Sequence, residues 1–144
     1  YDKPFYLTGK GGQRKIKYYA IDNVNNKTSN DDGVGSMVSM PYLDVTGPSI
    51  FHKFEGAEYQ ARDTIFISSK TKIQLKASDE ESGLQKITYR INMDEEIDYN
   101  GPFSVSGDGQ QELDFIAYDQ VNNLNKKKIS VCIDSQGPEI FTTF

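Results

Sequence analysis

Residues 112–123 read ELDFIAYDQVNN, and this stretch decides the fold class. Its first eight residues place apolar side chains at every second position, at Leu113, Phe115 and Ala117. Such period-two alternation over roughly five to eight residues is typical of an antiparallel strand with one buried face. Asp119 and a pair of asparagines follow, which is turn chemistry. The stretch therefore predicts a β-strand that ends in a hairpin.

The same alternation occurs in other parts of the chain. It is present at 71–78, 85–91 and 128–134, and shorter apolar runs at 64–68 and 102–106 also have the composition of strands. Residues that favour turns separate these segments. No stretch with helical periodicity is longer than one or two turns. The sequence therefore predicts an all-β protein.

The composition agrees with short, half-buried strands. The chain has 144 residues, with nine Tyr, eight Phe and no Trp. Aromatic residues suit strands, and a disordered chain has few of them. Cys132 is the only cysteine, which excludes an intrachain disulfide and a thiolate metal cluster. It lies between Val131 and Ile133 in a predicted strand, and we expect an inert thiol there.

A large part of the sequence occurs twice. YDKPFYLTGKGGQRKIKYYAIDNVNN at 1–26 aligns with YNGPFSVSGDGQQELDFIAYDQVNN at 99–123, after one extra residue in the first copy. DVTGPSIFHKF at 44–54 aligns with DSQGPEIFTTF at 134–144. The period is roughly 90–98 residues, which is the size of one immunoglobulin-like (Ig-like) sandwich. The order of the predicted strands also suits that fold.

This repeat predicts the domain organisation. We expect residues 1–46 to be the C-terminal half of an Ig-like repeat, 47–137 a complete repeat, and 138–144 the first strand of a further one. The expected fold is thus all-β, with tandem Ig-like antiparallel β-sandwiches and no disulfide. We expect such a chain to be a segment of a longer array. If it ended at residues 1 and 144, another chain would complete the half-repeats by strand exchange.

The repeated polar residues have a structural interpretation. An Asp side chain can accept backbone N–H bonds from residues further along a turn, and Asn tolerates a positive φ at low cost. Such a turn fixes the register of a hairpin, and a slip by one residue would expose its core face. The residues of the two predicted turns are Asp22, Asn25 and Asn26 in the first copy, and Asp119, Asn122 and Asn123 in the second.

A calcium site is the sharpest candidate for binding chemistry. In an Ig-like topology, two of the loops and the incoming linker lie at the same end of the domain, so their oxygen atoms could converge on a hard cation. The candidate ligands are Asp44 in the linker, Asp79, Glu80 and Glu81 in one loop, and Asp119 and Asn122 in the other. Alternatively, these residues are turn caps and solvated acids, because their spacing matches neither an EF-hand nor a cadherin linker.

The sequence predicts no catalytic site. His52 is the only histidine, so a Ser-His-Asp or Cys-His arrangement lacks residues, and we interpret His52 as a structural residue of a first strand. The acids of MDEEIDY at 93–99 lie on one predicted hairpin, whereas glycosidases place two acids on opposite sides of a cleft. We expect a solvated turn there, and a protein that is not an enzyme.

Charge and aromatic residues limit the partners. The net charge of −5 argues against binding to nucleic acid or to anionic membranes, and the basic run at 126–128 is expected on a solvated face. No stretch approaches the length of a transmembrane helix. Tyrosines that we expect to be exposed could form a strip for a protein partner or, less favoured, a carbohydrate. They are Tyr6, Tyr19, Tyr59 and Tyr118.

The segments SGLQKITYRI, YNGPFSVSGDGQQELDFIAYDQVNNL and VCIDSQGP together resemble a family of bacterial Ig-like surface repeats. This family, the OmpL-type Ig-like domain, is named after a spirochaete outer-membrane protein. The resemblance covers most of 79–138 and the partial copy in 1–48. The family has Gly where this chain has Asn122, and Asn is the next best residue for a positive φ. The resemblance implies exported or surface-exposed repeats without enzymatic activity.

The expected function follows from the repeat and the resemblance. We expect a segment of a large exported bacterial cell-envelope protein that acts as a structural spacer and protein-docking module, for instance in an outer-membrane assembly or transport complex. The linkers DVTGPSI and DSQGPEI support this role, because a proline restricts the angle between domains. The alternative is a surface adhesin or carbohydrate-binding module, which calcium could stiffen.

Overall fold

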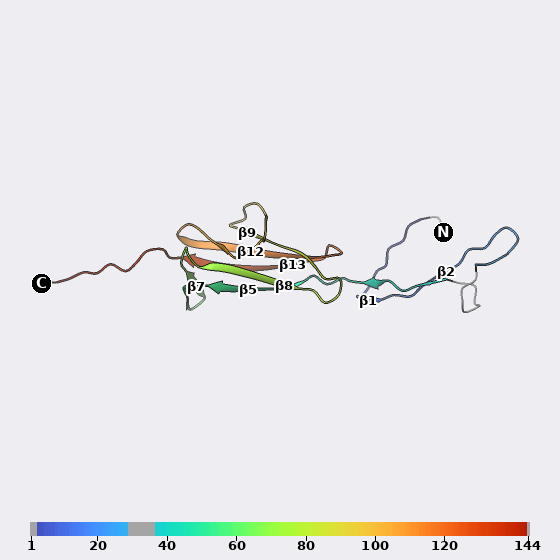
Figure 1. Ribbon diagram of the computed structural model, residues 1–144, viewed down its shortest axis with the longest axis horizontal. Helices are drawn as coiled ribbons and strands as arrows, with labels where there is room; N and C mark the ends of the chain where they lie inside the picture. Colours follow the sequence, from blue (N-terminus) through green and yellow to red (C-terminus); the bar gives the residue numbers. More distant parts are fainter. Residues whose placement is uncertain (1–2, 29–36, 144) are drawn as a thin grey trace. The chain divides into compact units, whose positions relative to one another are not determined.

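A computed structural model describes residues 3–28 and 37–143 of the chain (Figure 1). These residues form thirteen strands and no helix, which confirms the prediction of an all-β protein. The chain divides into two compact units, Tyr1–Thr46 and Gly47–Phe144.

The N-terminal unit contains four short strands that pair two by two. β1 pairs with β4 and β2 pairs with β3, and both pairs are antiparallel. Their bounds are β1 (Gly12–Gln13), β2 (Ile16–Tyr18), β3 (Met37–Ser39) and β4 (Tyr42–Leu43). A backbone hydrogen bond from Arg14 N–H to the Pro41 carbonyl, at 2.8 Å, lies between the two pairs. Together the four strands make one interrupted hairpin.

A six-stranded sheet forms one layer of the C-terminal unit. Its strand order is β10-β9-β12-β13-β7-β6. Its bounds are β6 (Glu58–Ala61), β7 (Thr64–Ile67), β9 (Leu84–Ile91), β10 (Ile97–Asp98), β12 (Gly109–Asp119) and β13 (Leu124–Ile133). All neighbours in this sheet are antiparallel except β7 and β13, which run parallel.

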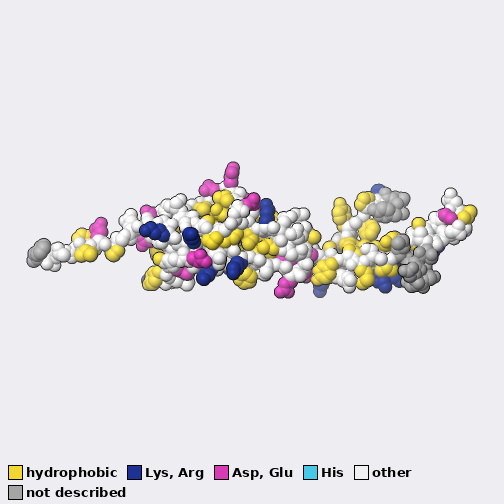
Figure 2. All heavy atoms as spheres, viewed as in Figure 1, with side chains coloured by type: hydrophobic (Ala, Val, Ile, Leu, Met, Phe, Trp, Pro, Cys, Tyr) yellow, Lys and Arg dark blue, Asp and Glu magenta, His cyan; other side chains and the backbone are white. Residues whose placement is uncertain are grey.

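A three-stranded antiparallel sheet forms the second layer. Its order is β11-β8-β5, with bounds β5 (Ser49–Glu55), β8 (Lys72–Ser78) and β11 (Phe103–Ser104). Figure 1 shows β5 and β8 in a layer that faces β12 and β13. The loop between β9 and β10 rises from the other side of the six-stranded sheet, and Figure 2 shows acidic side chains at its tip.

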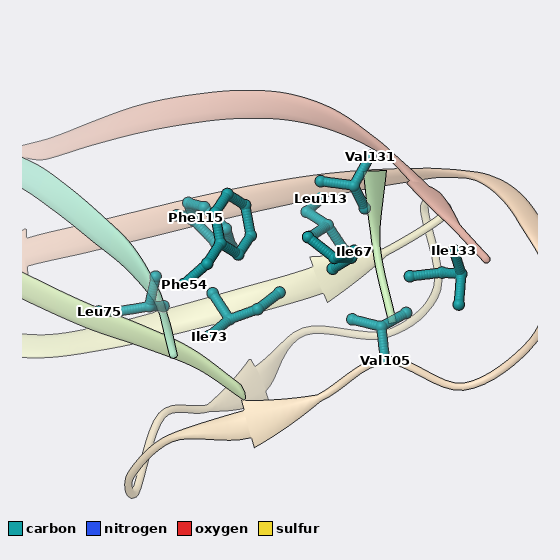
Figure 3. Close-up of a cluster of buried hydrophobic side chains, with 9 residues drawn as sticks. All are labelled: Phe54, Ile67, Ile73, Leu75, Val105, Leu113, Phe115, Val131 and Ile133. Carbon is teal, nitrogen blue, oxygen red and sulfur yellow. The ribbon is translucent and has the colours of Figure 1, made fainter. Parts of the chain in front are cut away.

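The hydrophobic core lies between the two layers of the C-terminal unit. Leu113, Phe115 and Ala117, which alternate along β12, are all 0% exposed, as the period-two pattern predicts. Side chains from both sheets meet there (Figure 3). The core cluster consists of Phe54, Ile67, Ile73, Leu75, Val105, Leu113, Phe115, Val131 and Ile133. Burial of this apolar surface stabilises the packing of the two sheets.

The predicted strands are present, with shifted ends. β12 begins at Gly109 and β13 begins at Leu124, so the hairpin is longer than the alternation indicates. The run at 102–106 contains only the two-residue strand β11. Sequence reasoning missed β6 and β10, which are short and lack a clear alternation. The basic run at 126–128 lies in β13, with Lys126 and Lys128 exposed, as expected.

Residues 138–143 form no strand in this structure. Ile140 and Phe141 are 89% and 84% exposed. A strand needs a neighbouring strand to satisfy its backbone groups, and no strand within the described residues pairs with 138–143. Phe144 lies outside the described residues. The assignment of 138–144 to a further repeat stays a prediction.

The hairpin of the N-terminal unit has the same register as the hairpin formed by β12 and β13. Each cross-strand pair of the first coincides with a pair of the second when the two copies of the repeat are aligned. The pairs are Gly12–Leu43 and Gly109–Ile133, Gln13–Tyr42 and Gln110–Cys132, Ile16–Ser39 and Leu113–Ile129, Lys17–Val38 and Asp114–Lys128, and Tyr18–Met37 and Phe115–Lys127. Residues 1–2 and 29–36 of the first copy lie outside the described residues.

Candidate functional site

Asp119 organises the turn between β12 and β13. Its carboxylate is 0% exposed. Oδ1 accepts the backbone N–H groups of Val121 at 2.9 Å and Asn123 at 2.7 Å, and Oδ2 accepts the side-chain amide of Asn123 at 2.7 Å. Asn122 adopts a φ of 67°, the conformation that Asn tolerates. Both carboxylate oxygens therefore take part in the turn.

Asp22 makes the same set of hydrogen bonds in the N-terminal unit. Oδ1 accepts the backbone N–H groups of Val24 at 2.9 Å and Asn26 at 2.8 Å, and Oδ2 accepts the Asn26 side-chain amide at 2.8 Å. Asn25 has a φ of 66°. Hydrogen bonds from Asn26, above all from its side chain, lower the pKa of Asp22. Unlike Asp119, Asp22 is exposed.

The loop between β8 and β9 lies beside the Asp119 turn. Asp79 Oδ1 accepts the backbone N–H groups of Glu81 at 3.1 Å and Gly83 at 2.9 Å. The Gly83 carbonyl in turn accepts the N–H of Gln120 at 3.0 Å, which joins the two loops. Oxygen atoms of Asp79 and Asp119 come within 4.8 Å of each other. Two of the loops that the calcium hypothesis invokes thus lie together.

The other candidate calcium ligands belong to these loops or to the N-terminal unit. Glu80, Glu81 and Asn122 are exposed on these loops. Asp44 belongs to the N-terminal unit, where its Oδ1 accepts the N–H of Thr46 at 2.9 Å. Calcium in proteins takes six to eight oxygen ligands, and the two adjacent carboxylates already accept backbone hydrogen bonds. Calcium binding stays a prediction.

Glu96 is the centre of a polar network on the outer face of the six-stranded sheet. Its Oε1 accepts hydrogen bonds from Thr88 Oγ1 at 2.7 Å and from the Tyr118 hydroxyl at 2.9 Å. Its Oε2 lies 2.8 Å from a guanidinium nitrogen of Arg90. The bond from Thr88, followed by those from Arg90 and Tyr118, outweighs the opposing effect of burial and lowers the pKa of Glu96 to about 2.

Two sequence-based predictions are therefore wrong. The acids at 93–99 do not all belong to a solvated turn, because Glu96 is half-buried in this network, whereas Asp94 and Glu95 are exposed. Tyr118 is half-buried instead of exposed, and burial, together with its bond to Glu96, raises its pKa. A signal was available in the sequence. Ile116 interrupts the alternation of β12 on this outer face, and it is almost fully buried.

His52 and Cys132 have the surroundings of structural residues. The His52 ring lies on β5, 5.4 Å from the ring of Phe54 and 5.7 Å from that of Phe115. Burial, followed by the nearby Lys127, lowers the pKa of His52. Cys132 is a free, half-buried thiol in β13. The arrangement agrees with the interpretation of His52 as part of a first strand.

The exposed aromatic residues do not form a row within the described part of the C-terminal unit. Tyr59 lies on the edge strand β6 of the six-stranded sheet, and Phe51 lies on β5 of the other sheet. Tyr6 and Tyr19, which are exposed as predicted, belong to the N-terminal unit. A continuous aromatic strip along one sheet is therefore not formed by these side chains.

Two of the hollows on the described part of the C-terminal unit are shallow. One, of about 190 Å³, is lined by Ala57, Glu58, Tyr59, Phe66, Ile67, Ser68 and Asp134. The other, of about 110 Å³, is lined by Phe51, His52, Lys53, Gln74 and Lys76. The first contains no histidine and the second no serine, threonine or cysteine, so neither brings a nucleophile and a histidine base together.

Comparisons of the chain with protein-family models, with characterised proteins and with solved structures find no significant match. Within the described residues there is no helix of the length and apolarity that crossing a membrane requires. The family resemblance and the function that it implies stay predictions, and they rest on the residues and the geometry described above.

Proposed function

We propose that the C-terminal unit is an Ig-like sandwich and that the chain is a segment of a tandem array of such domains. The strand order supports this. In Ig-like folds, strands C, F and G share one sheet, and strands A, B and E belong to the other. Here β9, β12 and β13 are consecutive in one sheet, and β5, β8 and β11 make up the other. The shared register of the two hairpins supports the repeat.

The function that we propose is a non-enzymatic spacer and protein-docking module in a large exported bacterial cell-envelope protein. One observation carries the spacer role: the linker into the C-terminal unit is tightly held. A Cβ atom on Gly47 would lie 2.5 Å from the backbone carbon of Leu124, so only glycine can pass this close to the hairpin. Pro48, the next residue, is fully buried and has a fixed φ. In the proposed array, a linker held in this way would restrict the orientation of each domain relative to the one before it.

An adhesin or carbohydrate-binding module is the alternative. A row of exposed aromatic side chains on one sheet would favour this alternative. Phe51 and Tyr59 of the C-terminal unit lie on different sheets, so protein docking is the better-supported role. A place in an outer-membrane assembly or transport complex is one form of it.

The spacer role can be tested with tandem copies of residues 47–137. We expect the maximum dimension from small-angle X-ray scattering to grow by a constant increment as one, two and four copies are joined by the native linker. The matched control replaces each linker by a Gly-Ser sequence of equal length, which behaves as a flexible coil. A spacer role is ruled out if native and Gly-Ser arrays have the same dimensions.

The location has its own test. Antibodies raised against residues 47–137 should label intact cells of the source organism, and protease added outside the cells should remove the signal. An antibody against a cytosolic protein controls for lysis. Labelling that appears only after the cells are permeabilised would contradict a surface location.

A further inference from the structure

The hairpin of the N-terminal unit has an apolar face that the described residues of its unit leave uncovered. Ile16, Tyr18 and Ala20 occupy alternate positions on the strand side of this face. Tyr18 is 47% exposed and Ala20 is exposed. Pro41 and Leu43, on the returning side of the hairpin, are half-buried. The face thus combines a fixed register with incomplete burial.

The equivalent face of the C-terminal unit is completely covered. The repeat aligns Ile16, Tyr18 and Ala20 with three residues of β12 that are 0% exposed. The aligned residues are Leu113, Phe115 and Ala117. The opposing sheet covers them with Phe54 of β5 and with Ile73 and Leu75 of β8 (Figure 3). The C-terminal unit therefore shows that apolar side chains of two neighbouring strands, β5 and β8, cover a face of this kind.

We propose that the uncovered face is a docking surface for a preceding segment of the same chain that has the strand pattern of residues 47–98. This inference rests on the proposed tandem array. On docking, Ile16 and Tyr18 would pack against the counterparts of Phe54, Ile73 and Leu75, with Tyr18 in the position of Phe115.

The chain itself repeats the beginning of this pattern. Residues 137–144 carry Gly, Pro, Ile and two Phe at the same spacing as 47–54, which contains β5. In the described part of this second occurrence, Ile140 and Phe141 are almost fully exposed. The sequence of the first strand of the pattern therefore recurs along the chain, although the described residues 138–143 form no strand.

A second copy of the chain is a poorer occupant of this face. Its own residues 47–98 already bury Ile73 and Leu75 in their own unit. They would have to leave that core, and expose it, in order to cover another one. A separate segment of the same pattern carries no such cost.

The test is a fusion of residues 47–98 directly ahead of Tyr1 of the full chain. The repeat aligns Tyr1 with Tyr99, so the fusion restores the natural spacing. Amide hydrogen exchange is then compared between the fusion and the original chain. We expect the amides of β2 and β3 to exchange at least about 100-fold more slowly in the fusion, because local opening would now expose a core. The amides of β12 and β13 serve as an internal reference for folding.

A matched control carries Ile73→Asp in the added segment only. It has the same length and should leave β2 and β3 as unprotected as in the original chain. The proposal is overturned if the unmodified fusion gives no protection, or if the control gives the same protection. A Tyr18→Asp change gives a second reading: it should abolish the protection in the fusion and leave the original chain unaffected.

Sedimentation of the original chain over a range of concentrations tests whether a second copy of the chain covers this face. We expect a monomer. A dimer in which β2 and β3 are protected would overturn the proposal in favour of a second copy. The scattering experiment on tandem copies of 47–137 does not contain this hairpin, so failure of the docking proposal and failure of the spacer role can be told apart.

Discussion

The two hairpins of this chain have the same turn and the same register, but within the residues that the structure describes only the hairpin of the C-terminal unit packs against a core. The Asp119 and Asp22 turns make matching hydrogen bonds that differ by at most 0.1 Å in length. Phe115 is 0% exposed, whereas Tyr18 in the aligned position is 47% exposed. The geometry of the hairpin is therefore encoded locally, in the turn and the pairing, and burial depends on the opposite sheet.

The largest effect should come from removing the aromatic side chain at the aligned core position. Phe115→Ala is expected to destabilise the C-terminal unit by about 3–5 kcal/mol, because it leaves a cavity between two sheets. Tyr18→Ala should cost less than about 1 kcal/mol, because its side chain is half in solvent. Urea unfolding followed by circular dichroism measures both. Equal losses would show that the first hairpin has a core of its own.

The turn aspartates come next. Asp119→Ala should cost about 2–3 kcal/mol in the same unfolding experiment, because the backbone N–H groups of Val121 and Asn123 lose an acceptor that is fully buried. Asp22→Ala should leave global stability nearly unchanged and speed amide exchange only at Val24 and Asn26, which water can reach. If Asp22→Ala unfolded the chain, the local origin of the hairpin geometry would be wrong.

Glu96 should make the stability of the C-terminal unit, which contains the β12–β13 hairpin, decrease in acid. Its pKa in the folded protein, about 2, lies below the ordinary 4.5. The carboxylate therefore stabilises the fold above about pH 5, and this contribution disappears as the pH falls toward 2. Glu96→Gln is expected to cost about 2 kcal/mol at pH 7, with the difference from the native chain closing in acid. Urea unfolding at several pH values measures this difference.

A matched control and a comparison with the N-terminal unit sharpen this prediction. Glu95→Gln changes an exposed side chain on the same loop and should have little effect on stability at any pH. The repeat aligns Tyr118, a partner of Glu96, with Ile21, which is exposed and cannot donate such a bond. A gap between the native chain and Glu96→Gln that did not narrow in acid would exclude the carboxylate as its source.

The smallest effect is expected at the residues of positive φ. Asn122→Gly should change stability by less than about 0.5 kcal/mol, since glycine reaches this conformation freely but loses more entropy on folding. Asn25→Gly should be equally mild, as read from amide exchange in its hairpin. A clear loss of stability or of amide protection at only one of the two sites would mean that its Asn side chain has a role beyond the turn.

Much of this architecture could be predicted from residues that are close in sequence. The alternation around Phe115 gives the strand and its buried face, and the Asp-x-x-Asn-Asn pattern gives the turn, because both depend on short-range geometry. The repeat then locates the hairpin of the N-terminal unit without any knowledge of the core.

The remaining features depend on contacts between distant segments. Thr88, Glu96 and Tyr118 belong to three different parts of the chain, and each has the ordinary appearance of a polar residue on a solvated face. β10 has two residues and no periodicity to reveal it. The exposed segment at 138–143 shows the same limit, since its sequence suits a strand but strand formation depends on a neighbouring strand, and none within the described residues pairs with it.

The parallel pairing of β7 and β13 has a mechanical consequence. In this ladder Ile65, Phe66 and Ile67 lie beside Val131, Cys132 and Ile133, and the N–H of Asp134 donates to the Ile67 carbonyl at 2.9 Å. Tension that reached β7 from its amino end and β13 from its carboxyl end would pull the two strands in opposite directions along their axes. Their hydrogen bonds would then carry the load together, as a shear clamp, instead of breaking one at a time like a zipper.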